Sequence, residues 1–162
     1  FFHTFSYFMD GLAFTGEALC GSFAGACDRP MIHRCVRRLL LWGLMLTILF
    51  TFLYSIGARP VAALLTSQNE VVAQVGRYWY WVGAIPLVSV WAFIFDGVYI
   101  GLTATRRMLV STFAAAATFF AVSLASPAFT VDILWSAFLG YLLVRGVALA
   151  LMTPNTLKSV DS

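Results

Sequence analysis

Four ionisable side chains lie inside long apolar stretches of the chain. They are Asp10 and Glu17 near the start, Asp96 in the middle and Arg145 in the last apolar stretch. At the centre of a bilayer each would cost several kcal/mol, about 2.5–3.5 on insertion scales, so such residues normally face a protein interior or a wet cavity. A buried carboxyl group can take up a proton near neutral pH, or hold a cation while it is ionised.

The spacing of the three carboxylates is informative. Asp10 and Glu17 are seven residues apart, close to two helical turns, so they share one helix face about 10 Å apart. Asp96 stands in IFDGVYIGLTAT, where Gly97 and Gly101 form a GxxxG pair that permits close helix packing. All three are candidates for proton or cation coupling. The alternative for each is a structural hydrogen bond to a neighbouring helix.

Arg145 has two structural interpretations. Its long side chain can reach the inner membrane interface, or it can pair with Asp96 or Glu17. Polar and aromatic residues near the carboxylates are candidates for lining a cavity: Tyr7, Phe14, Tyr99 and Thr103.

The amino-acid composition indicates what kind of environment surrounds these four ionisable residues. Apolar residues make up 61% of the chain and charged residues 10%, far below the roughly 25% of soluble domains. Five stretches are long and apolar enough to cross a bilayer, at residues 1–26, 39–56, 78–102, 108–126 and 133–152. Because no alternation with regular turns occurs, we predict an all-α integral membrane protein, a polytopic helix bundle rather than a barrel.

The basic residues predict the orientation of the bundle. Two connectors and the tail at residues 153–162 share one side and carry Arg29, Arg34, Arg37, Arg38, Arg106, Arg107 and Lys158. The opposite connectors carry only Arg59 and Arg77. Basic loops stay inside, so we expect a multi-pass protein of the inner membrane with a cytoplasmic C-terminus. We also expect further sequence upstream, because five spans with this orientation start on the outer side.

The connector after the second stretch has helix signals of its own. Pro60 can open a short helix over Val61 to Leu65. Ser67 and Glu70 match a capping box, so a second helix should begin near Gln68 and run into the third span.

Enzymatic and metal motifs are not found in the sequence. There is no GxSxG, HExxH or P-loop. His3 and His33 are too far apart to form a shared metal site, and the three cysteines form no paired framework. The arginines lie in short clusters between apolar stretches and do not form one basic face of the kind that binds nucleic acid. We therefore expect no enzyme, no metal, no cofactor other than a coupling ion, and no nucleic-acid partner.

Two stretches resemble a known family. FSYFMDGLAFTGEALCGSFAG resembles the eighth helix of MATE transporters of the DinF-like branch, and IFDGVYIGLTATRRM resembles their tenth helix and the loop behind it. YWYWVGAIPLVSV lies between them at the family's spacing. The resemblance covers nearly the whole chain as helices eight to twelve.

This resemblance implies a twelve-helix fold of two six-helix bundles, and export of cationic or amphiphilic organic molecules driven by inward proton or sodium flow. Its implied partners are the lipid bilayer, an N-terminal bundle of helices one to seven, and small organic substrates. The acids of the two motifs, Asp10, Glu17 and Asp96, remain the coupling candidates. Three alternatives stay open: a lipid or lipid-linked sugar flippase of a related two-bundle fold, an integral-membrane enzyme, and a non-catalytic membrane subunit.

Overall fold

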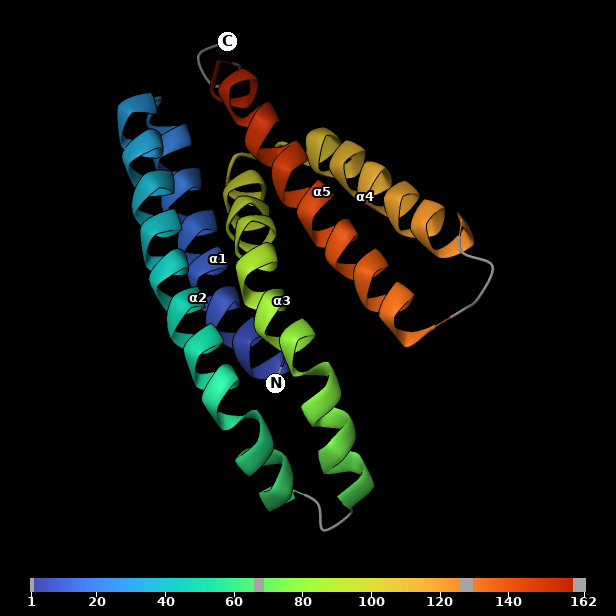
Figure 1. The fold of residues 1–162 in the computed structure, drawn as a ribbon. Helices are drawn as coiled ribbons and strands as arrows, with labels where there is room; N and C mark the ends of the chain where they lie inside the picture. Colours follow the sequence, from blue (N-terminus) through green and yellow to red (C-terminus); the bar gives the residue numbers. More distant parts are fainter. Residues whose placement is uncertain (1, 66–68, 126–129, 159–162) are drawn as a thin grey trace.

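The described residues of the chain form a bundle of five helices. A computed structural model describes residues 2–65, 69–125 and 130–158. The helices are α1 (Phe2–Gly25), α2 (Arg29–Leu65), α3 (Asn69–Gly101), α4 (Thr105–Ala125) and α5 (Val131–Lys158) (Figure 1). No strand occurs in these residues, which confirms the predicted all-α bundle.

Four of the helices contain a stretch that is long and apolar enough to cross a membrane. These stretches are Arg29–Ile56, Gly83–Gly101, Thr105–Ala125 and Val131–Leu157. Helix α1, which carries two carboxylates and four glycines over 24 residues, is not among them. The first predicted span, at residues 1–26, is therefore helical but stays a prediction as a membrane span.

The helices extend beyond the predicted apolar stretches. The arginine-rich connector is itself the first part of α2, because arginine and leucine favour helix and Asp28 caps its start. The Asp28 Oδ1 atom accepts from the Met31 amide at 3.1 Å. The predicted tail is helical as far as Lys158.

The predicted helix after Pro60 is not a separate element. Residues 61–65 are the last turns of α2, which passes through Pro60 without a break. Helix α3 begins at Asn69, and Ser67 of the predicted capping box lies outside the described residues.

Two turns of the same construction join the helices at one end of the bundle. In each, a residue with positive φ follows the helix, Cys27 at 56° and Thr103 at 54°. The next amide bonds back to the helix, Asp28 to the Phe23 carbonyl at 2.9 Å and Ala104 to the Tyr99 carbonyl at 3.0 Å. This is the Schellman motif, which usually has glycine at that position.

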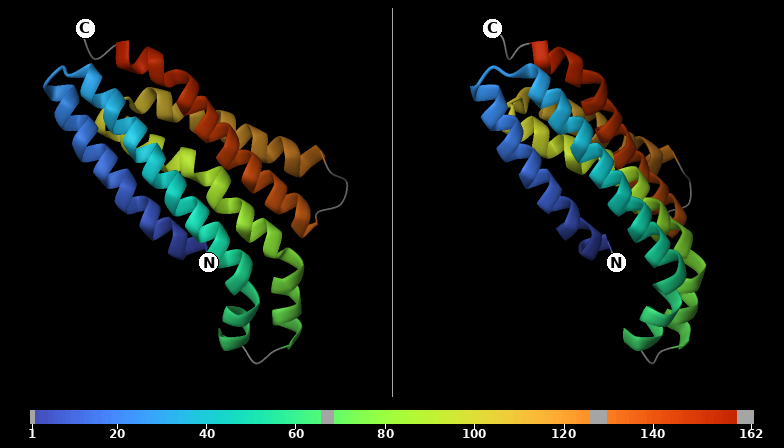
Figure 2. Two further views of the ribbon diagram at one scale, coloured as in Figure 1. Left: turned by 60° about the vertical axis from the view of Figure 1, so that its left-hand side comes forward. Right: turned by 90° about the vertical axis from the view of Figure 1, so that its left-hand side faces the viewer.

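Helix α3 is the centre of the bundle. It packs against α1 and α2 on one side and against α5 on the other, while α4 packs mainly on α5. The further views show α4 and α5 together on one side of α3 (Figure 2). A side chain at Gly97 would collide with the Ala13 carbonyl, and one at Gly101 with the Glu17 carbonyl. The predicted GxxxG pair therefore lets α1 and α3 approach each other closely.

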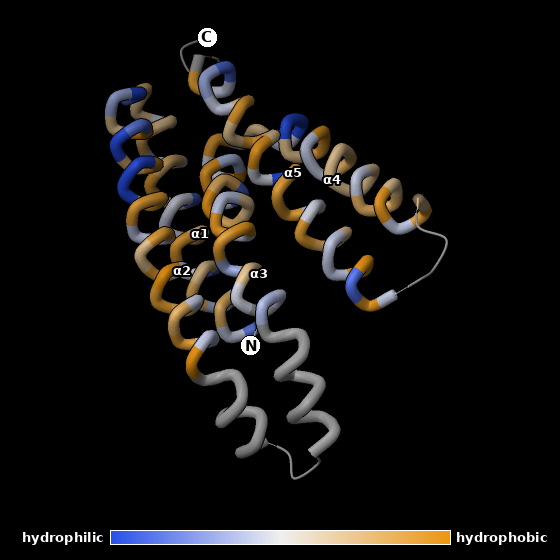
Figure 3. The backbone as a smooth tube through the Cα atoms, in the orientation of Figure 1, coloured by the Kyte–Doolittle hydropathy of each residue, from blue (hydrophilic) through white to orange (hydrophobic). Residues whose placement is uncertain are grey.

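The surface of the bundle suits lipid. Large apolar side chains are exposed along α2 and α4, whereas Ser111 and Ala115 are the buried residues of α4. Hydrophilic residues gather at the end where α2 and α4 begin (Figure 3). The bundle thus has an apolar surface along its helices and a basic end.

Candidate functional site

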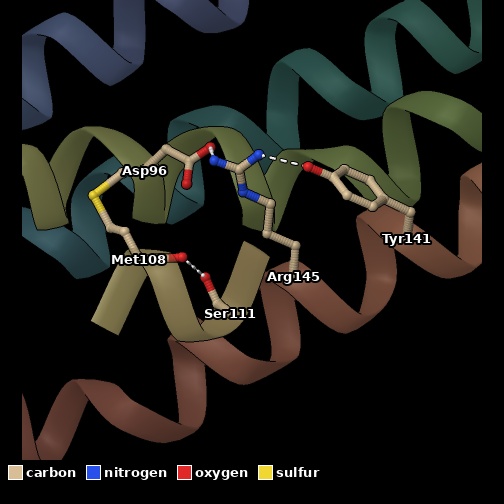
Figure 4. Close-up of polar contacts among 5 residues, drawn as sticks. All are labelled: Asp96, Met108, Ser111, Tyr141 and Arg145. Carbon is tan, nitrogen blue, oxygen red and sulfur yellow. Dashed lines mark hydrogen bonds and ion pairs between the residues drawn. The ribbon is translucent and has the colours of Figure 1, made fainter. Parts of the chain in front are cut away.

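Asp96 and Arg145 form an ion pair between α3 and α5. The Arg145 Nη2 atom lies 3.0 Å from the Asp96 Oδ2 atom, and the two side chains are 23% and 25% exposed. Figure 4 shows the two side chains pointing toward each other. Both belong to apolar helices, so the pair holds opposite charges together in a region of low polarity where each alone would be costly.

Tyr141 is the second partner of the arginine. Its hydroxyl oxygen accepts a hydrogen bond from Arg145 Nη1 at 3.0 Å. The two residues lie four apart on α5, one turn from each other on the same face. Tyr141 therefore directs the guanidinium group across to α3 (Figure 4).

The pair is held by one carboxylate oxygen. Asp96 Oδ1 and Arg145 Nε are buried and have no hydrogen-bond partner among the described residues. A bidentate arginine–carboxylate pair would use both oxygens and be stronger. Met108 and Ser111 of α4 lie beside the pair, and the Ser111 hydroxyl donates to the Met108 carbonyl at 2.8 Å rather than to Asp96 (Figure 4).

Asp10 and Glu17 have a different setting. Both are half-buried on α1, and the backbone of Glu17 lies against Gly101 of α3. Neither has an ion-pair partner within the described part of the chain, and Arg145 pairs with Asp96 rather than with Glu17. The structure thus joins one of the three predicted carboxylates to the predicted arginine. Roles for all three in ion coupling stay predictions.

The four candidates for lining a cavity fall in three places. Tyr7 and Phe14 are exposed on α1, at 77% and 68%. Tyr99 is fully buried, and its hydroxyl donates to the Leu149 carbonyl at 2.8 Å, which ties α3 to α5. Thr103 lies in the turn before α4 and borders a cavity of about 660 Å³. Whether any of them contacts a substrate stays a prediction.

One polar contact was not predicted from the sequence. Asp132, at the start of α5, accepts hydrogen bonds from the Tyr80 hydroxyl at 3.3 Å and from Trp81 Nε1 at 3.2 Å. No local sequence pattern indicates this contact, because Asp132 lies 52 and 51 residues along the chain from its two partners. For Tyr141, by contrast, the four-residue spacing to Arg145 was a usable signal.

No group of three or more possible metal ligands occurs among the residues that the structure describes. The candidate site consists of the Asp96 carboxylate, the Arg145 guanidinium group and the Tyr141 phenol.

Comparison with known proteins identifies the family. The family model MatE matches residues 1–125, most of the chain. The chain belongs to the MATE family. This MATE chain is 32% identical over 145 residues to "DNA damage-inducible protein F" of Escherichia coli (strain K12), which confirms the resemblance to the DinF-like branch. No solved structure matches.

The extent of these matches also matters. The aligned residues are 90% of this MATE chain and 32% of the E. coli protein, so the chain spans about a third of that relative's length. The family match contains Asp10, Glu17 and Asp96 and ends before Arg145.

Proposed function

We propose that this chain is the C-terminal transmembrane part of a secondary active transporter that exports drugs or other amphiphilic organic compounds in exchange for protons or sodium ions. Family membership supports transport, and the ion pair between Asp96 and Arg145 supports coupling to a cation. An N-terminal bundle of the same transporter would form the other wall of the substrate cavity.

Asp96 is the coupling carboxylate in this proposal. It lies inside an apolar stretch of α3, is partly accessible, and has one oxygen without a partner among the described residues. A proton or sodium ion bound there would neutralise it as Arg145 does now. Since two cations competing for one carboxylate exclude each other, binding of the coupling ion would release Arg145 and loosen α5 from α3.

This competition supplies what a coupled transporter needs. A ligand shifts a conformational equilibrium only as far as it binds the two states unequally. Asp96 would bind the coupling ion weakly while Arg145 is in place and more strongly after the guanidinium group has moved away. Asp10 and Glu17, on the other side of α3, are further candidates for the same role.

The proposed location is the inner membrane with the C-terminus in the cytoplasm. The turns that carry Cys27 and Thr103 lie at one end of the bundle, next to the arginines that begin α2 and α4. That end would be cytoplasmic because basic connectors stay inside.

Efflux by the full-length transporter with Asp96→Asn tests the proposal. We expect export of a fluorescent cationic dye to lose most of its dependence on the proton or sodium gradient, at unchanged protein level. Asp28→Asn is the matched control, because it removes a carboxylate outside the apolar stretches and asparagine caps helices as well as aspartate does. If Asp96→Asn cells exported the dye with the normal gradient dependence, the coupling role would be wrong.

A further inference from the structure

A cavity of about 660 Å³ opens at the basic end of the bundle. Its walls come from the end of α1, the turn between α3 and α4, and Thr156 near the end of α5. Gly21, Gly25 and Gly101 contribute no side chain, and a Cβ atom at Gly25 would meet nothing within 4 Å. Gly25 therefore leaves open space in the cavity wall that a larger side chain could fill.

The cavity is suited to an anion. Arg106 and Arg107 line it, and no lining residue is acidic in the described part of the chain. The Nη1 atom of Arg107 is buried and has no hydrogen-bond partner among the described residues, so a donor remains unsatisfied beside the cavity. Helix α4 begins at Thr105, also in the lining, and the start of a helix of 21 residues adds partial positive charge.

An apolar surface continues from the cavity along α4. Leu109, Val110 and Phe113 follow Arg106 at spacings of three, four and seven residues, which places all of them on one helix face. Their side chains are exposed, at 58%, 54% and 68%. A molecule with an anionic head in the cavity could therefore lay a hydrocarbon chain along this face.

We propose that this cavity binds the phosphate group of an anionic membrane lipid, with the lipid's acyl chain on the exposed face of α4. Basic pockets between membrane helices are suitable sites for acidic headgroups. The lipid would join the ends of α1, α3 and α5 to the start of α4 and so stabilise the basic end of the bundle. This site lies in the turn before α4 and does not depend on the role of Asp96.

Lipid-dependent stabilisation of the purified full-length transporter tests this site. We expect phosphatidylglycerol, added to protein in phosphatidylcholine nanodiscs, to raise the melting temperature. Replacement of Arg106 and Arg107 by glutamine should weaken the apparent lipid affinity about fivefold for each arginine. The matched control replaces Arg37 and Arg38 by glutamine. This change removes the same amount of charge at the same end of the bundle, but neither residue lines the cavity.

A second variant fills the cavity without changing charge. Gly25→Leu has room for its Cβ atom and should abolish the lipid-dependent rise, whereas Gly11→Leu, at an equally open position on α1, should retain it. If the Arg37/Arg38 control lost as much lipid affinity as the Arg106/Arg107 variant, the lipid would be attracted only by the charge of the surface. That result would overturn the proposed site. Stabilisation by inorganic phosphate alone, with no added effect of lipid, would assign the cavity to a soluble anion and overturn the lipid proposal. An unchanged response of both cavity variants would also overturn it.

Discussion

In the proposed mechanism, stability and transport place opposite demands on the ion pair between Asp96 and Arg145. Removing one member of a buried pair leaves an uncompensated charge, which typically costs about 3–5 kcal/mol, and less where the pair is partly exposed, as this one is. The proposed coupling requires the pair to open during transport, however, so the pair should not be too strong. The contact through a single carboxylate oxygen, with the other oxygen unbonded among the described residues, fits such an exchangeable pair.

Arg145→Gln should therefore change the ion dependence of transport. Without the guanidinium group, the coupling ion no longer competes for Asp96, so we expect half-maximal efflux at a cation concentration on the order of tenfold lower. Arg145→Lys keeps the charge and should stay closer to the original protein. Dye efflux from vesicles at varied proton and sodium concentrations measures this shift.

A purely structural role for Arg145 would give another pattern. Efflux by Arg145→Gln would then fall with the amount of folded protein, and its ion dependence would not move. The double variant Arg145→Gln/Asp96→Asn separates the structural role from the coupling role further. It should restore charge balance and stability but not ion coupling.

At the scale of the elements, glycines set how closely α1 and α3 approach. The backbone of α1 occupies the space that a side chain at Gly97 would need. Such contact places the backbone of Glu17 of α1 directly against Gly101 of α3. The close approach of the two helices is thus part of what positions Glu17.

Gly97→Ala should destabilise the bundle by pushing α1 away from α3. The added methyl group collides with the Ala13 carbonyl, which is backbone and cannot rotate away, so we expect a loss of about 1–3 kcal/mol. Gly11→Ala is the matched control, since nothing lies within 4 Å of its Cβ position and alanine favours helix over glycine. Thermal unfolding of the two detergent-purified full-length variants compares them. Equal melting temperatures would contradict the close packing.

The sequence predicted the helices better than their contacts. Apolar runs identify the spans, because lipid requires long apolar helices, and the GxxxG pair at Gly97 predicted close packing correctly. The extension of α2 back to Arg29 was missed because a basic connector is polar whether it is helical or not. Both turns escaped prediction for a different reason, since Cys27 and Thr103 stand where glycine is usual.

The sequence reduced the possible ion-pair partners of Arg145 to two carboxylates but did not decide between them. A helical position defines a face on its own helix, yet the rotation of α5 against α3 depends on the packing of all five helices. Both Asp96 and Glu17 therefore satisfied the sequence pattern. Asp132 was missed on similar grounds, because its partners Tyr80 and Trp81 lie about 50 residues away along the chain.

The whole molecule has two ends of different chemistry. Its basic end carries the two Schellman turns, the arginines of α2 and α4 and the cavity beside Arg107. At the other end, Asp132 is held by aromatic residues of α3. This polarity makes the proposed orientation testable with one residue.

Cys27 is a suitable reporter of the orientation. It is exposed in the turn between α1 and α2, whereas Cys20 and Cys35 are buried and can be replaced by alanine. In a full-length protein that retains Cys27 as its one cysteine, we expect a membrane-impermeant maleimide to react only after the cells are permeabilised, because the adjacent arginines hold this turn inside. Thr130→Cys, in a protein without other cysteines, is the matched control at the opposite end, where the exposed start of α5 should react in intact cells. Labelling of Cys27 in intact cells, with Thr130→Cys protected, would invert the bundle and place the basic cavity on the outer face.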